Sequence, residues 1–175
     1  MLFNTKLFIL GFLPLAVGGY LAFGQLGRRA ALGWIFCCSL AFYAWWKPIL
    51  VLLLVVSILL NFFVGKRIVV EKQGRAWLIA GLAFNLGLLC FFKYANFFSA
   101  LLGMSPPFGG IYLPLGISFF TFQQIMYLVD THCGDIGAVP FLDYACFISF
   151  FAQLIAGPNV RPRHILPQVA TVVPL

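Results

Sequence analysis

Charge is scarce in this sequence, and acidic residues are the scarcest. Only 9% of the 175 residues are charged and four are acidic, whereas soluble domains carry about 25% charged residues. Hydrophobic residues make up 63% of the chain, with a mean hydropathy of +1.04. A chain this apolar would precipitate in water, so the composition excludes a soluble enzyme or binding domain and predicts an integral membrane protein with the lipid bilayer as its partner.

The net charge of +7 does not predict a nucleic-acid partner. In membrane proteins an excess of Lys and Arg reports loop orientation and contact with anionic headgroups. The sequence also lacks the common catalytic motifs: it contains no nucleophile elbow, no HExxH and no paired-carboxylate pattern. Gly65-Lys66-Arg67 is not a phosphate loop, because the upstream Gly and the following Ser or Thr are missing. We therefore expect no metal site and no bound cofactor.

The five cysteines do not form a recognisable framework. No CxxC spacing occurs, and an odd number argues against a set of disulfides. Four of the five lie inside apolar runs, where Cys behaves as a small hydrophobic residue. We interpret all five as structural.

What the chain does contain is a series of hydrophobic runs near the ~20 residues that a membrane-spanning helix needs. The runs cover approximately residues 7–23, 30–46, 49–64, 76–92, 111–129 and 141–156. We predict an all-α, polytopic integral membrane protein with about six hydrophobic helices, in a single membrane domain over residues 1–175. The start loosely resembles a signal peptide, but it lacks a small-x-small cleavage site, so we expect it to remain as the first helix.

Polar segments separate these runs. Residues 65–75 form the one clear polar loop, and residues 96–102 are a short aromatic piece that would lie in the interface. Six basic residues fall on one side of the alternating runs and predict a cytoplasmic side there, with a periplasmic N-terminus. These are Arg28, Arg29, Lys66, Arg67, Lys72 and Arg75.

The same alternation becomes inconsistent near the end of the chain. It places residues 130–139 inside and the basic residues 161–164 outside, against the positive-inside rule. Either the segment 141–156 is re-entrant, or these basic residues line a cavity. The sequence leaves both open.

Arg161 and Arg163 are the strongest polar candidates. Two guanidinium groups on either side of Pro162 form a pair of planar donors, which suits a phosphate or carboxylate group. The alternative is a pair of anchors at the membrane interface. The pattern favours neither.

The remaining ionisable candidates have simpler interpretations. Asp130, at the end of an apolar run, is expected to cap Arg161 or a backbone group. His132 could form a metal site or an acid–base pair with Asp130 and Asp135, but its Gly- and Asp-containing surroundings favour a solvated loop. His164 is likewise expected in a polar loop rather than in catalysis.

Several segments together resemble a known family. Leu113–Gln123, Tyr127–Asp130 and Phe150–Arg161 look like the membrane-bound O-acyltransferase (MBOAT) superfamily, in its alginate O-acetyltransferase-like branch. Residues 91–98 and Asn61 fit the same branch. The resemblance covers essentially the whole chain and implies a partial MBOAT fold.

The resemblance implies acyl transfer at the bacterial inner membrane. The donor, acetyl-CoA or an acyl carrier, would enter a funnel from the cytoplasm, and the acceptor would be an extracytoplasmic polysaccharide such as alginate. A base activates the acceptor hydroxyl, which is otherwise a poor nucleophile. Partners among other polysaccharide-acetylation proteins are implied as well.

The resemblance also assigns roles to residues of this chain. Funnel-lining or substrate-contacting roles fall on Gln123, Asp130, Gln153, Pro158, Arg161 and Arg163. The family's catalytic His lies beyond residue 175, so the chain looks like an amino-terminal portion that is inactive alone. The alternative function is a non-catalytic membrane module, such as a transporter or channel subunit or an assembly partner.

Overall fold

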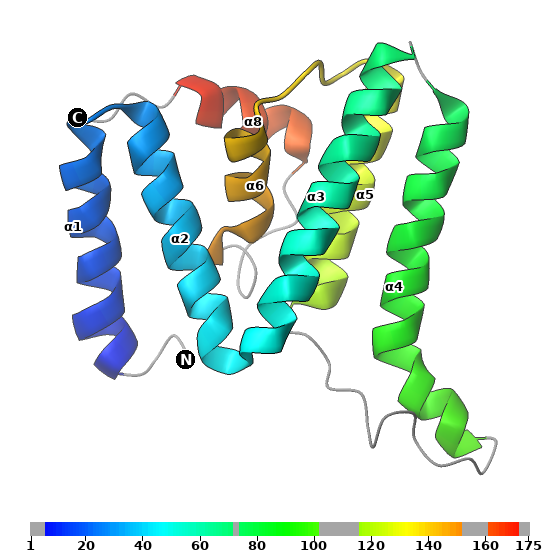
Figure 1. Cartoon of the computed structure of the whole chain (residues 1–175), viewed down its shortest axis with the longest axis horizontal. Coiled ribbons are helices and arrows are strands. Elements are labelled where there is room, and N and C mark those ends of the chain that lie inside the picture. Colours follow the sequence, from blue (N-terminus) through cyan, green and yellow to red (C-terminus); the bar gives the residue numbers. More distant parts are fainter. Residues whose placement is uncertain (1–5, 72–73, 102–115, 152–160, 172–175) are drawn as a thin grey trace.

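The protein is a bundle of antiparallel helices (Figure 1). The computed structural model describes residues 6–71, 74–101, 116–151 and 161–171, and no strand occurs among them. The prediction of an all-α protein is therefore confirmed for this part of the chain. The elements are η1 (Phe8–Phe12), α1 (Leu13–Gly24), α2 (Arg28–Trp46), α3 (Pro48–Val70), α4 (Arg75–Leu101), α5 (Ile117–Cys133), α6 (Phe141–Ser149) and α8 (Pro162–Thr171).

Helices α1 to α5 run alternately up and down, and α8 lies across one end of them (Figure 1). We call this the upper end; among the described residues it contains 25–27, Glu71, Gly74 and 134–140. Helix α5 packs against α3 and α4, while α6 packs against α2, α3 and α5. The main core lies where these helices meet and includes Leu54, Ile58, Leu128 and Tyr144.

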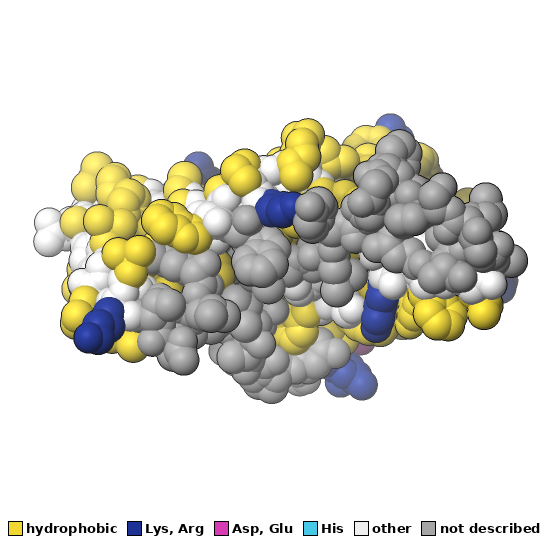
Figure 2. Space-filling model, turned by 90° about the horizontal axis from the view of Figure 1, so that it is seen from below, with side chains coloured by type: hydrophobic (Ala, Val, Ile, Leu, Met, Phe, Trp, Pro, Cys, Tyr) yellow, Lys and Arg dark blue, Asp and Glu magenta, His cyan; other side chains and the backbone are white. Residues whose placement is uncertain are grey.

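Two helices, α3 and α4, are long and apolar enough to cross a membrane. At 1.5 Å per residue, the 23 residues of α3 extend about 34 Å, slightly more than a hydrocarbon core. Many large apolar side chains are exposed, including Leu10, Ile49 and Leu86. The lower end likewise presents hydrophobic surface with only scattered basic side chains (Figure 2). These features are consistent with a membrane protein, and the number of spans stays a prediction.

Helix α3 continues past the point where we predicted a polar loop. Residues 65–70 are helical and only then does the chain turn, so the predicted loop 65–75 is wrong in its first half. Gly65 and Ile68 are buried, whereas Lys66 and Arg67 are exposed. Packing on one face therefore keeps this segment helical despite its charges. The aromatic piece after residue 95 is likewise part of α4, not a separate element.

Helix α5 is bounded by two glycines with positive φ, Gly116 (68°) and Gly134 (84°). The left-handed conformation at Gly134 allows the amide of Asp135 to donate to the carbonyl of Asp130 at 2.9 Å, which ends the helix. His132 lies in the last turn of α5, so our placement of His132 in a loop was wrong. The predicted fifth run began at residue 111, and residues 111–115 lie outside the described part of the chain.

Helix α6 is much shorter than predicted. It has 9 residues and ends at Ser149, a length of about 14 Å, too short to cross a membrane. Helix α8, which we did not predict, packs on both α6 and α5 at the upper end (Figure 1). The segment therefore returns to the end where it began. The re-entrant alternative is consistent with this packing, and the side of the membrane on which residues 161–164 lie stays a prediction.

Candidate functional site

A network of neutral polar side chains crosses the bundle interior between α3, α4 and α5. Ser57 donates to Oε1 of Gln124 at 2.7 Å, and Asn61 donates to the same oxygen at 3.0 Å. Asn85 donates to Oδ1 of Asn61 at 2.6 Å and also to the carbonyl of Gly81 at 2.8 Å. The four side chains are at most 1% exposed. Because buried polar groups must find partners, this network fixes the register of three helices.

The sequence analysis named Asn61 but missed Ser57 and Asn85. All three are polar residues inside predicted apolar spans, and polar groups at such depth usually face a protein interior. That signal would have been sufficient to select them. It could not have shown that they meet, because Asn61 and Asn85 belong to different helices.

A second group of buried polar atoms has no hydrogen-bond partner within the part of the chain that the structure describes. Both amide atoms of Gln123 are unpartnered, and the side chain is 0% exposed. Oδ2 of Asp130 is also unpartnered, and Asp130 is only 9% exposed. Further unpartnered atoms belong to Tyr43, Thr121, Gln124, His132, Tyr144 and Ser149. Buried polar groups without a partner are rare, and a bound water, ion or ligand is a common explanation for them.

The upper end is held together by a buried ion pair that the sequence analysis did not foresee. Nη2 of Arg28 lies 2.7 Å from Oδ1 of Asp143, whose side chain is only 3% exposed. Nη2 and Nε of Arg28 also donate to the carbonyl of Val169, at 3.0 and 3.2 Å. Arg28 is the first residue of α2, whereas the second predicted run began at about residue 30. One guanidinium thus joins α2, α6 and α8, and we call these contacts of Arg28 with Asp143 and Val169 the clamp.

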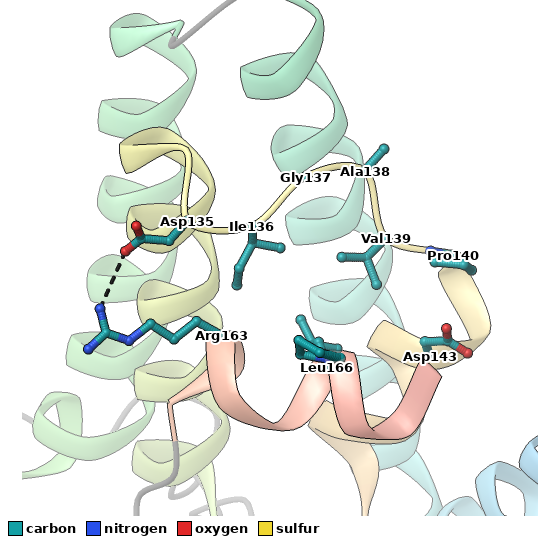
Figure 3. A pocket seen from close by; sticks show the side chains of 10 residues that line it. Asp135, Ile136, Gly137, Ala138, Val139, Pro140, Asp143, Arg163 and Leu166 are labelled. Atoms are coloured by element: carbon teal, nitrogen blue, oxygen red, sulfur yellow. Dashed lines mark hydrogen bonds and ion pairs between the residues drawn. The ribbon is translucent and has the colours of Figure 1, made fainter. Parts of the chain in front are cut away.

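A pocket of about 210 Å³ lies beside this clamp, between residues 135–140 and α8. Ile136, Val139 and Leu166 point into it and make its lining apolar (Figure 3). At its edge Nη1 of Arg163 meets Oδ2 of Asp135 at 3.5 Å, with the two side chains 39% and 45% exposed. An ion pair this long and exposed contributes little stability.

The structure distributes the predicted site residues over two regions. Arg161 and Arg163 are exposed at the upper end, and Gln123 and Asp130 are buried in α5. Asp130 uses its backbone carbonyl to end α5, and the described residues show no bond between its carboxylate and Arg161. Gln153 and Pro158 lie outside the described residues, and so does the side chain of His164.

The metal-site alternative for His132 finds no support in the geometry. Among residues 6–71, 74–101, 116–151 and 161–171, no three His, Cys, Asp or Glu side chains gather closely enough to hold a metal ion. Most of the unpartnered interior groups are instead amides and hydroxyls, which both donate and accept. Such a set can bind neutral hydroxyl-bearing molecules or water.

Comparison with known proteins finds relatives that are named as O-acetyltransferases. The chain is 39% identical to a peptidoglycan O-acetyltransferase of Helicobacter pylori, over 96% of the chain and 38% of that protein. It is 36% identical to a probable alginate O-acetylase of Pseudomonas aeruginosa, over 96% of the chain and 34% of that protein. The relatives are membrane-bound O-acyltransferases, and this chain is homologous to a part of them. The resemblance inferred from the sequence is confirmed.

The chain spans about a third of the length of these O-acyltransferases. A probable alginate O-acetylase of Azotobacter vinelandii matches in the same way, at 35% identity over 96% of the chain and 36% of that protein. No family model and no solved structure matches. The names of the relatives imply an acyl donor as their co-substrate.

Proposed function

We propose that the chain forms part of a membrane-embedded O-acetyltransferase that acts on a bacterial cell-surface polysaccharide. The observation that carries this is the identity of 32–39% to O-acetyltransferases over about 96% of the chain. Peptidoglycan and alginate, named for the relatives, define the acceptor class as a sugar polymer. The acceptor atom is a hydroxyl, and the donor carries an acetyl group.

We place the protein in the bacterial inner membrane with the upper end in the cytoplasm. The basic residues Arg28, Arg29, Lys66, Arg67 and Arg75 all belong to helix ends at the upper end. Arg161 and Arg163 join them there because α8 packs on the same end. With the re-entrant α6, the positive-inside rule becomes consistent for the whole described chain. The N-terminus is then periplasmic.

Reporter fusions test this orientation. We expect fusions after Gly74 and after Gln168 both to report the cytoplasm, and a fusion after Lys47, at the other end of α2, to report the periplasm. A simple six-span alternation predicts opposite sides for Gly74 and Gln168. Opposite signals at these two positions would overturn the re-entrant arrangement, while a cytoplasmic signal at Lys47 would reverse the whole orientation.

Gln123 and Asp130 are the residues we assign to the interior of the acyl-transfer path. The unpartnered amide of Gln123 offers one donor group and one acceptor, which matches a hydroxyl that also donates and accepts. Oδ2 of Asp130 lies about two turns further along α5, and an ionised carboxylate is purely an acceptor. A hydroxyl-bearing acceptor or its water would satisfy both groups.

Arg161 and Arg163 are the residues we assign to the donor. Both are exposed at the cytoplasmic end, and Arg163 borders the 210 Å³ pocket. A phosphate or carboxylate of the donor, or of its carrier, would replace Asp135 on Arg163 and engage the guanidinium in two parallel hydrogen bonds.

A chimeric enzyme tests the proposed function. The region of the Pseudomonas aeruginosa alginate O-acetylase that matches this chain is replaced by the chain itself, and alginate O-acetylation is measured in cells that lack their own enzyme. We expect acetylated alginate. Within the chimera, Arg161→Lys with Arg163→Lys should raise the KM for the donor about tenfold, as expected for losing a bidentate contact. Gln123→Leu should lower transfer without changing that KM.

Membrane abundance of each chimera serves as the control for folding. Arg29→Lys, an exposed arginine that lies on α2, should leave the donor KM unchanged. An abundant chimera that acetylates nothing would contradict the proposed function. An unchanged donor KM in the double arginine variant would leave these residues as interface anchors.

A further inference from the structure

Arg67 occupies an unusual position at the upper end of α3. Its guanidinium carbon lies 5.0 Å from the ring centre of Phe63 and 5.6 Å from that of Trp77, so two aromatic faces hold it. Glu71 lies one turn along the chain, at the spacing that commonly gives an ion pair. Glu71 instead accepts a hydrogen bond from the indole of Trp77 at 2.7 Å.

The arrangement leaves the edge of the Arg67 guanidinium available. Among the described residues no carboxylate pairs with it, since the ion pairs there are Arg28–Asp143 and Arg163–Asp135. Stacking uses the faces of the planar group, and its N–H donors lie in the plane. Arg67 is therefore an oriented, unoccupied fork of donors, and this is the geometry that binds a phosphate group through two hydrogen bonds.

An apolar stripe continues from Arg67 down the same face of α3. The positions 4, 7, 11, 15 and 18 residues before Arg67 recur at helical spacing and so share its face. They are Phe63, Leu60, Val56, Leu52 and Ile49, and their exposed fractions lie between 42% and 69%. From Phe63 to Ile49 this stripe extends about 21 Å, which is longer than half of a ~30 Å hydrocarbon core.

The charge around Arg67 selects the kind of headgroup. Lys66 and Arg75 are exposed beside Arg67. The ammonium group of Lys66 lies 5.9 Å from the ring centre of Phe62. The single nearby acid, Glu71, is engaged by Trp77. A headgroup with a net negative charge is favoured at such a site over one whose phosphate is neutralised by an ammonium group.

We propose that Arg67, Phe63 and Trp77 form a binding site for one anionic phospholipid, with the phosphate on Arg67 and an acyl chain along the exposed stripe of α3. The site goes beyond the proposed acyl transfer and requires only that the upper end faces a membrane surface. Glu71 has a positioning role, because its bond to Trp77 keeps it from neutralising Arg67.

Native mass spectrometry of the chain in detergent tests the site. The chain is titrated with phosphatidylglycerol, and with phosphatidylcholine of the same acyl chains. We expect one tightly retained phosphatidylglycerol per chain and weaker phosphatidylcholine binding. Arg67→Lys keeps the charge but loses the planar fork, and should weaken phosphatidylglycerol binding about tenfold. Trp77→Phe keeps a ring but releases Glu71 to pair with Arg67, and should also weaken binding.

Arg75→Lys is the matched control, since Arg75 is an exposed arginine at the same end and makes no cation–π contact among the described residues. It should change binding less than about twofold. Circular dichroism checks that each variant remains helical. Unchanged affinity in Arg67→Lys and Trp77→Phe, or equal affinity for the two lipids, would overturn the proposal. Displacement of the lipid by glycerol 1-phosphate at equal concentration would overturn the role of the acyl-chain stripe.

Discussion

Replacing Arg28 with Ala is expected to destabilise the bundle by about 3 kcal/mol. This is the lower end of the range for removing one partner of a buried ion pair, because the Arg28 side chain is still 28% exposed and water can reach it. The change leaves the carboxylate of Asp143 buried without its partner at 2.7 Å. It also removes the two hydrogen bonds to the carbonyl of Val169 in α8. The expected fall in melting temperature is about 6–12 °C.

Thermal unfolding of the purified chain in detergent provides the measurement, followed by the reaction of a thiol dye with the buried Cys38 and Cys146. Cys146 lies in α6 and its thiol contacts the carbonyl of Leu32 at 3.1 Å, so its exposure reports the separation of α6 from α2. Arg29→Ala is the control, because Arg29 is the exposed neighbour on the same helix. Equal melting temperatures for the two variants would show that the clamp contributes nothing.

A double replacement separates the cost of an unpaired charge from the value of the pair. Arg28→Leu with Asp143→Leu removes both charges, and replacing a buried ion pair by apolar side chains is often close to neutral. We expect this double variant to melt well above Arg28→Leu alone. If the two losses simply add, the side chains are not coupled and the clamp interpretation fails.

The clamp also marks what the sequence could not reveal. The apolar runs predicted the helices because apolar runs of about 20 residues are typical of membrane-spanning helices. The pairing of Arg28 with Asp143, 115 positions apart, follows from the return of α6 to the upper end, and no local pattern encodes that return. The sequence placed Arg28 between the first two apolar runs, and in the structure it is the first residue of α2.

Element ends were missed where tertiary packing overrides local composition. The charges at Lys66 and Arg67 suggested a loop, but Ile68 is 0% exposed and keeps α3 helical to Val70. The interior residues were partly predictable: the family resemblance singled out Gln123 and Asn61. The unpartnered state of Gln123 depends on three helices meeting, so only the structure could reveal it.

Replacing Gly65 with Ala is expected to destabilise the protein by about 2 kcal/mol, although the same change usually stabilises a helix. A Cβ at this position would lie 2.5 Å from the hydroxyl oxygen of Tyr127 and 2.6 Å from its Cε1. Tyr127 cannot easily move, because it is 2% exposed and its ring centre lies 4.4 Å from that of Tyr144. Overpacking typically costs about 1–3 kcal/mol, and we expect about 3 kcal/mol here because the neighbouring ring is rigid and buried. Subtracting the gain of about 1 kcal/mol from helix propensity leaves a net loss of about 2 kcal/mol.

The matched control is the same substitution at Gly87, on the exposed face of α4, where a Cβ would meet nothing within 4 Å. We expect Gly87→Ala to raise the melting temperature slightly and Gly65→Ala to lower it by about 4–8 °C.

Adding Tyr127→Leu to Gly65→Ala should cost less than the sum of the two single changes, since the clash is then removed. Shifting α5 away from α3 would also lengthen the 2.7 Å bond from Ser57 to Gln124. Opposite signs for one substitution at two glycines would establish close approach of α3 and α5 as the reason for Gly65, whereas stabilisation at both positions would exclude it.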